Sequence, residues 1–165
     1  MSNKIFYTLV AVFIIASSFF WIYMFQGKSF ALPFSETETV NAEGISLTMY
    51  HSPTCGCCVK WAEYLEEHGV EVTMEETMNV YGTKRDHGVP NQLSSCHTAV
   101  VDGYVIEGHV PVEDIVRLLE ERPDAIGLSV PGMPLNSPGM DLPSDEEYQT
   151  VLFDSENISV YNTHN

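Results

Sequence analysis

Apolar and polar residues alternate along part of the chain with two different periods, which predict its strands and helices. Residues 46–50 and 70–74 alternate with a period of two, as the strands of a sheet do. Residues 56–68 repeat their apolar side chains every three or four positions, which predicts an amphipathic helix. We expect a shorter helix within residues 79–88.

A hairpin and a third helix follow in the predicted order. An Asp-Gly dipeptide at 102–103 separates residues 98–101 from residues 104–106, and this dipeptide favours a tight turn between two strands. Pro111 suits the first turn of a helix, which we expect to end before Pro123. The order β-α-β-α-β-β-α is that of the thioredoxin/glutaredoxin class of α/β folds.

The C-terminal part, residues 124–165, is interpreted as an extension packed on a domain formed by residues 45–123. The tripeptide Pro-Gly-Met occurs twice within residues 130–140, which predicts a loop. Residues 148–153 and 158–161 are typical of two strands and predict a terminal hairpin.

The N-terminal part, residues 1–28, contains a long apolar segment. Residues 5–25 carry no charge and no proline, and as a helix they would span about 32 Å, enough to cross a bilayer. We therefore expect a membrane anchor, followed by an acidic linker over residues 29–44. The alternative is a signal peptide cleaved at the small residues 29–31. Both interpretations place the domain in the bacterial periplasm, either anchored to the inner membrane or soluble.

The charge distribution excludes one class of partner. The 165 residues include 7 Lys and Arg against 23 Asp and Glu, which gives a formal net charge of −16. All acidic residues follow residue 35, together with only five of the basic ones. Nucleic-acid binding requires clustered basic side chains, so we exclude it.

Three of the four cysteines fall within four positions: Cys55, Cys57 and Cys58. They lie where the first strand is expected to meet the first helix, and the N–H groups of a helix N-terminus stabilise thiolates. The fourth, Cys96, precedes the strand expected at residues 98–101. If that strand runs antiparallel to residues 46–50, Cys96 lies beside the other three sulfurs.

Two histidines are expected at the same end of the sheet. His97 follows Cys96 and stands roughly where thioredoxins have a cis-proline that shields the cysteines from metal. His109 follows the strand expected at residues 104–106 and is the weaker ligand candidate, because a loop position also explains it. Thiolate with imidazole suits Cu(I) or Zn(II). Closely spaced sulfurs favour several bridged Cu(I) ions over a single tetrahedral Zn(II).

Other residues have weaker links to this site. His51, at the end of the first strand, is expected to neighbour the ligands without being one. His164 belongs to no recognisable cluster of residues. Met133 and Met140 provide either thioether ligands or core packing.

Two other functions remain open at this point. Cys55 and Cys58 have the spacing of a thiol–disulfide oxidoreductase, with Cys55 as the nucleophile and Cys58 as the resolving thiol. Two structural disulfides are the third possibility, in which the domain is an interaction module. Cys57 favours the metal site, because disulfide exchange has no use for a third thiol.

Several motifs resemble the CopG-type copper-resistance family. They are residues 52–58 (Ser-Pro-Thr-Cys-Gly-Cys-Cys), 95–98 (Ser-Cys-His-Thr) and 101–111 (Val-Asp-Gly-Tyr-Val-Ile-Glu-Gly-His-Val-Pro), with the two Pro-Gly-Met tripeptides of 130–140. The resemblance extends over about residues 47–161. It implies a periplasmic, thioredoxin-like protein in which thiol oxidation and copper loading are coupled. It also implies that copper is bound by four residues: Cys55, Cys57, Cys58 and Cys96.

The leading hypothesis is therefore a copper-binding protein that sequesters Cu(I), transfers it, or converts copper between redox states. Whether it is an enzyme stays open. Its expected partners are copper ions, other copper-handling or redox proteins of the periplasm, and the inner membrane through residues 5–25.

Overall fold

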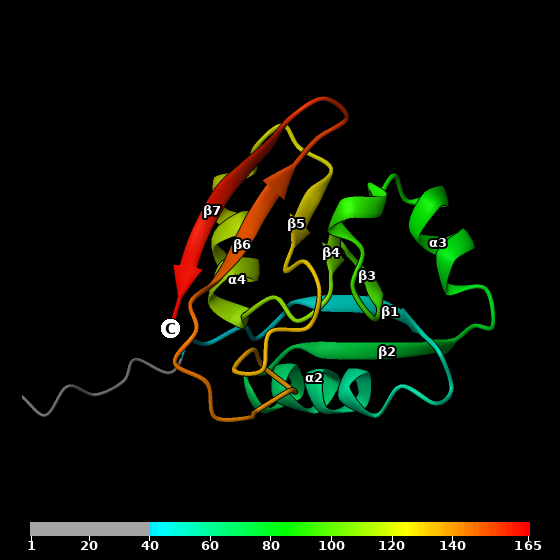
Figure 1. The fold of residues 1–165 in the computed structure, drawn as a ribbon, viewed down its shortest axis with the longest axis vertical. Coiled ribbons are helices and arrows are strands. Elements are labelled where there is room, and N and C mark those ends of the chain that lie inside the picture. Colours follow the sequence, from blue (N-terminus) through cyan, green and yellow to red (C-terminus); the bar gives the residue numbers. More distant parts are fainter. Residues whose placement is uncertain (1–39) are drawn as a thin grey trace, which may run out of the picture. The chain divides into compact units, whose positions relative to one another are not determined.

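The computed structural model describes residues 40–165 of the chain (Figure 1). The expected membrane anchor of residues 1–28 lies outside these residues, as does most of the linker. Among the helices of residues 40–165, none combines the length and the hydropathy that crossing a membrane requires.

The helices and strands follow the predicted order. Along the first part of the domain they are β1 (Ser46–His51), α2 (Gly56–Glu67), β2 (Glu71–Glu76), α3 (Val80–Asp86), a 3₁₀ turn (Asn91–Leu93), β3 (Thr98–Val101), β4 (Tyr104–Glu107) and α4 (Val112–Glu121). Three further strands follow: β5 (Gly127–Ser129), β6 (Tyr148–Phe153) and β7 (Ile158–His164). The prediction of an α/β fold with three helices is confirmed.

All seven strands belong to one sheet, in the order β2-β1-β3-β4-β5-β6-β7. β1 pairs in parallel with β2 and antiparallel with β3, and β3 pairs antiparallel with β4. The turn between β3 and β4 has positive φ angles at Asp102 and Gly103, as its Asp-Gly dipeptide predicts. The pairing of β1 with β3, on which the predicted site depends, is therefore confirmed.

Apolar side chains cover both faces of the sheet. On one face, buried residues of α2 and α4 share a core with the strands, and Trp61 of α2 and Ile115 of α4 are among them. On the other face, Val89 and Leu93 from the segment after α3 pack with Val105 of β4. The larger core thus supports α2, whose N-terminus carries the cysteines.

The C-terminal residues continue the sheet. β5 pairs in parallel with β4, and β6 and β7 form the predicted hairpin beside it. β5 was not predicted, because three residues are too few to display a period. Gly127 makes this pairing possible, since a Cβ there would overlap the carbonyl oxygen of Val105.

Candidate metal centre

Three segments distant in sequence meet at one end of the sheet. β1 and β3 are in register with Tyr50 opposite Thr98, and β3 and β4 with Thr98 opposite Glu107. The loop after β1, the loop before β3 and the loop after β4 therefore lie together. Cys55 lies in the first of these loops, Cys57 and Cys58 lie in the first turn of α2 that follows it, and the other two loops carry Cys96, His97 and His109.

The four sulfurs form one cluster. Their Sγ atoms all lie within 4.8 Å of one another. Cys55 and Cys58 are joined by a disulfide, whereas Cys57 and Cys96 are free. The Sγ of Cys57 lies 3.6 Å from that of Cys55 and 3.7 Å from that of Cys96. Cys57 thus connects the disulfide to the distant cysteine.

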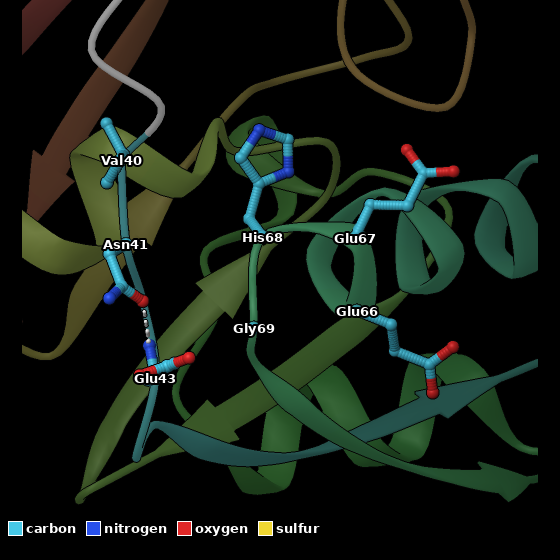
Figure 2. A pocket seen from close by; sticks show the side chains of 7 residues that line it. All are labelled: Val40, Asn41, Glu43, Glu66, Glu67, His68 and Gly69. Atoms are coloured by element: carbon cyan, nitrogen blue, oxygen red, sulfur yellow. Dashed lines mark hydrogen bonds between the residues drawn. The ribbon is translucent and has the colours of Figure 1, made fainter.

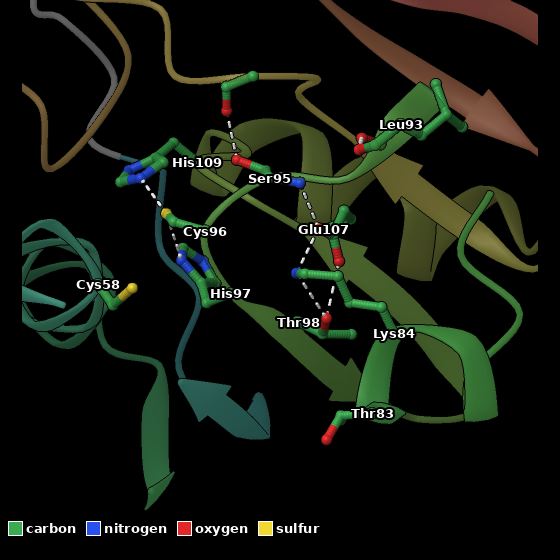
Figure 3. Close-up of polar contacts among 12 residues, drawn as sticks. Cys58, Thr83, Lys84, Leu93, Ser95, Cys96, His97, Thr98, Glu107 and His109 are labelled. Carbon is green, nitrogen blue, oxygen red and sulfur yellow. Dashed lines mark hydrogen bonds and ion pairs between the residues drawn. The ribbon is translucent and has the colours of Figure 1, made fainter. Parts of the chain in front are cut away.

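Two imidazoles extend the cluster on the other side of Cys96. The Nε2 of His109 lies 2.9 Å from the Sγ of Cys96, and the Nδ1 of His97 lies 3.4 Å from it. Figure 3 shows Cys96 between the two rings. A second group of possible ligands, Cys96, His97 and His109, therefore shares Cys96 with the four sulfurs. His109, the weaker candidate on sequence, is buried and directed at the thiol.

Burial determines the protonation of these groups. It raises the pKa of Cys96 to about 12, helped by the negative charge of Cys57. It lowers the pKa of His97 well below the ordinary 6.5, together with repulsion from His109, and it also lowers the pKa of His109. At neutral pH the imidazoles are uncharged and able to bind a metal, whereas a metal at Cys96 must displace a proton.

The C-terminal extension holds His109 in place. The Nδ1 of His109 lies 2.7 Å from the carbonyl oxygen of Pro138. Because a carbonyl only accepts, Nδ1 is the protonated nitrogen and Nε2 presents its lone pair to Cys96. The same loop packs against α2 at Gly139, whose φ is +80° and where a Cβ would lie 2.6 Å from the backbone nitrogen of Trp61. The Pro-Gly-Met loop is therefore part of the site.

A buried ion pair supports the loop that carries Cys96. The Nζ of Lys84 lies 2.7 Å from the Oε1 of Glu107, and both side chains are buried. The same Oε1 accepts a hydrogen bond from the Ser95 backbone nitrogen at 2.6 Å, and Oε2 accepts one from Thr98 at 2.8 Å (Figure 3). The ion pair of Lys84 and Glu107 was not predicted from the sequence. The available signal was a single carboxylate at the end of the apolar strand β4.

Comparison with known proteins identifies the family of the chain. The family described as "Protein of unknown function, DUF411" matches residues 93–140. The solved structure of copper resistance protein CopG, form 2, is 40% identical, with a TM-score of 0.69, and the match covers 74% of this chain and 100% of that one. The chain is a member of the CopG copper-resistance family. Form 1 of the same protein is 38% identical with a TM-score of 0.69, covering 73% of this chain and 97% of that one. None of the curated proteins matches the chain.

Membership of the CopG family confirms the resemblance drawn from the cysteine and Pro-Gly-Met motifs. It supports a copper-related function, for which the cysteine cluster provides a site capable of binding metal.

The remaining sulfur and imidazole candidates lie apart from this cluster or at its edge. Met133 is exposed, so its core-packing alternative is wrong. His51 is buried at the end of β1, and its Nδ1 lies 2.9 Å from the carbonyl oxygen of Ser52. The interpretation of His164 as isolated is wrong, because its Nε2 lies 2.7 Å from the carboxylate of Asp114. These two residues are 50 positions apart, so no local pattern indicates the contact.

An open pocket at the other end of α2 differs in chemistry from the cysteine cluster. Figure 2 shows Glu43, Glu66, Glu67 and His68 among the residues that line it. Carboxylates are hard ligands that suit Mg²⁺ or Ca²⁺ rather than copper in its soft, monovalent form. Of the two sites, the cysteine cluster at the N-terminus of α2 is therefore the one suited to a soft metal ion.

Proposed function

We propose that the chain is a periplasmic copper-binding protein that holds Cu(I) at the cysteine cluster and acts in copper resistance by sequestration, transfer or redox conversion of the metal. The four cysteines are the main ligands, and His97 and His109 are further ones. Residues 5–25 anchor the protein to the inner membrane. Membership of the CopG family and the clustering of soft ligands support this proposal.

The observation that carries the proposal is the sharing of Cys96 between two ligand groups. One group contains only sulfur, and the other adds the imidazoles of His97 and His109. A thiolate has several lone pairs and can bridge two ions, so a shared cysteine suits more than one Cu(I). Zn(II) by contrast takes four ligands in a closed tetrahedron around one ion. The arrangement therefore favours bridged Cu(I).

The disulfide makes full metal binding dependent on reduction. Cys55 and Cys58 become ligands only when their disulfide takes up two electrons and two protons to give two thiols, which release these protons to the solvent as they bind the metal. Before reduction, Cys57, Cys96 and the two imidazoles are the available ligands. Periplasmic dithiol proteins are the class of reductant that matches this step.

Anaerobic titration of the reduced full-length protein with Cu(I), in detergent, tests the proposal. We expect tight binding that weakens strongly in Cys57→Ser and in Cys96→Ser. Met78→Leu is the matched control, because it removes an exposed sulfur that lies outside the cluster. If both cysteine variants bind as the control does, the proposal is wrong.

A second candidate function is thiol–disulfide exchange, which the Cys55–Cys58 disulfide itself favours. In this function Cys55 attacks a substrate disulfide and Cys58 resolves the mixed disulfide. A disulfide reductase assay separates the two functions, since exchange by Cys55 and Cys58 survives Cys96→Ser and tight copper binding does not. The interaction module with two disulfides receives no such support, because Cys57 and Cys96 are free.

A further inference from the structure

His51 is a buried histidine at the end of β1, four residues before Cys55 in the sequence, and has no assigned role. It ends β1, and its side chain is buried on the same face of the strand as Leu47 and Met49. These two residues belong to the core that also contains Cys58 and Trp61 of α2. His51 is therefore on the inner side of the helix whose N-terminus carries the cysteines.

The strand register places His51 beside His97. Met49 pairs with Ala99 and Tyr50 pairs with Thr98. Continuing this register by one residue brings His51 opposite His97, with both side chains on the same face of the sheet.

Both histidines have a buried nitrogen without a partner. Within residues 40–165, the Nε2 of His51 and the Nε2 of His97 are inaccessible to solvent and make no hydrogen bond. Leaving a buried polar atom unpaired costs about 1–3 kcal/mol, and such atoms are rare in native proteins. Two such atoms, on residues that the register sets opposite one another beside a cluster of soft ligands, point to a ligand-binding site.

The hydrogen bond of His51 leaves its free nitrogen as a ligand. Its Nδ1 lies 2.9 Å from the Ser52 carbonyl, which only accepts, so the neutral ring carries its proton on Nδ1 and a lone pair on Nε2. His109 has the same arrangement with the Pro138 carbonyl. Histidines that bind metals usually donate their second nitrogen in this way, because the bond orients the ring.

The Nδ1 of His97 is engaged at the cysteine cluster, since it lies 3.4 Å from the Sγ of Cys96. The Nε2 of His97, which makes no hydrogen bond, is therefore the ring nitrogen left to bind an ion.

We propose that the Nε2 atoms of His51 and His97 form an inner binding site for one Cu(I) ion, behind the cysteine cluster. The choice of ion rests on the proposed function. Two neutral imidazoles suit a monovalent soft ion with few ligands, whereas Zn(II) requires four.

Nitrogen NMR of the histidine rings in the reduced, full-length wild-type protein tests this site without any substitution. Before copper is added, we expect the His51 Nε2 signal to be that of an unprotonated ring nitrogen. Anaerobic addition of Cu(I) is expected to shift this signal, along with that of the His97 Nε2. If the signal of the His51 Nε2 stays in place while copper fills the cysteine cluster, the inner site does not exist.

The variant His51→Gln provides a second test. Glutamine keeps a donor for the Ser52 carbonyl but offers only an amide oxygen, which a soft ion disfavours. We expect this variant to bind one fewer Cu(I) than the wild type. His68→Gln is the matched control, because the Nδ1 of His68 also bonds a carbonyl, that of Tyr64, at the opposite end of α2. Equal copper contents in both variants would contradict the proposal.

The outcome also separates this proposal from the proposed function. If the inner site alone is wrong, Cu(I) still binds tightly and Cys57→Ser and Cys96→Ser still weaken binding. If the copper function is wrong, the wild-type protein itself binds Cu(I) no better than those two variants.

Discussion

Within residues 40–165, a cluster around Cys96 and a cluster around Asp114 both contain buried polar groups and histidine, and they differ in how completely their polar atoms are paired. At the cysteine end of the sheet, His97 and His109 surround the thiol of Cys96, and the Nε2 of His97 has no partner among the described residues. The second cluster joins α4 to the C-terminal hairpin and is built on the carboxylate of Asp114. That carboxylate accepts from Thr150 at 2.5 Å and from Asn162 at 2.8 Å, and the Nε2 of His164 lies 2.7 Å from it.

The difference indicates separate roles. A buried carboxylate with three partners is already stabilised and closes the fold by tying β6 and β7 to α4. At the Cys96 cluster, by contrast, the Cys96 thiol contacts only other possible metal ligands and the Nε2 of His97 contacts nothing, so these atoms lack that stabilisation until a ligand supplies it. We therefore interpret the Asp114 cluster as structural and the Cys96 cluster as the binding site.

The largest expected effect concerns the ion pair beneath the Cys96 loop. Lys84→Met leaves the Glu107 carboxylate buried without its cation, which we expect to lower the free energy of unfolding by about 3–5 kcal/mol. Urea unfolding measures this loss. A loss below about 1 kcal/mol would show that the carboxylate is stabilised mainly by its hydrogen bonds.

Two double variants separate the stability provided by this pair from its influence on the site. Both Lys84→Met/Glu107→Gln and Lys84→Met/Glu107→Leu remove the charges, but only glutamine keeps an oxygen that accepts from the Ser95 nitrogen. We expect the leucine variant to bind Cu(I) about 10-fold more weakly than the glutamine variant, because the Cys96 loop loses its support. Equal affinities would restrict the pair to a role in stability.

The variant His109→Gln directly tests whether the Cys96 cluster binds the metal. We expect Cu(I) affinity to fall by at least about 10-fold, the smallest effect typical of disturbing the groups around a metal ligand. Competition with a coloured Cu(I) chelator measures it. An unchanged affinity would make His109 a packing residue and leave the sulfurs as the only ligands beside His97.

The pH dependence of stability is expected to reveal the uncharged histidine rings of the Cys96 cluster. Burial lowers the pKa of His97 and of His109 below the ordinary 6.5, so as pH falls the unfolded chain takes up these protons before the folded one. The contribution of the neutral rings is complete above pH 6.5 and is lost below it, by up to about 1.4 kcal/mol per pH unit for each ring. Urea unfolding of the metal-free protein from pH 7.5 to 5 measures the slope, which His109→Gln should reduce. If His109→Gln leaves the slope unaltered, the loss of stability at low pH does not come from His109.

The variant His164→Gln, in the Asp114 cluster, should have the smallest effect, and this effect should fall on stability and not on copper binding. Asp114 loses one of its three partners, which we expect to cost about 1 kcal/mol of stability. Cu(I) affinity should be unchanged. If copper binding weakens as it does in His109→Gln, the two clusters are coupled and the distinction between them fails.

Much of the fold was predictable because its signals are local. Apolar residues that recur every two positions predicted β1 and β2, and those that recur every three to four positions predicted α2, each within a few residues of its bounds. The Asp-Gly dipeptide located the turn after β3. The strand β5 was not predictable, because it owes its pairing to the close approach of Gly127 to Val105 rather than to a pattern of its own.

The site was predictable to the extent that it follows from strand pairing. Once β3 is antiparallel to β1, Cys96 must lie beside Cys55, and this juxtaposition was predicted. Lys84 and Glu107 were missed, since each is unremarkable among its sequence neighbours. His164 was misjudged for the same reason, as its partner Asp114 lies on another element.

The sequence by itself determined the α/β order, the acidic charge, the soft ligand set and the likeness to the CopG family, because hydrophobic period, residue chemistry and motif are properties of the chain. Only the tertiary structure decided that Cys57 connects the Cys55–Cys58 disulfide to Cys96, that His109 reaches the thiol, and that His51 faces His97. These contacts depend on register and on packing between distant segments. A shift of one residue in the pairing of β1 with β3 would put His51 and His97 on opposite faces of the sheet.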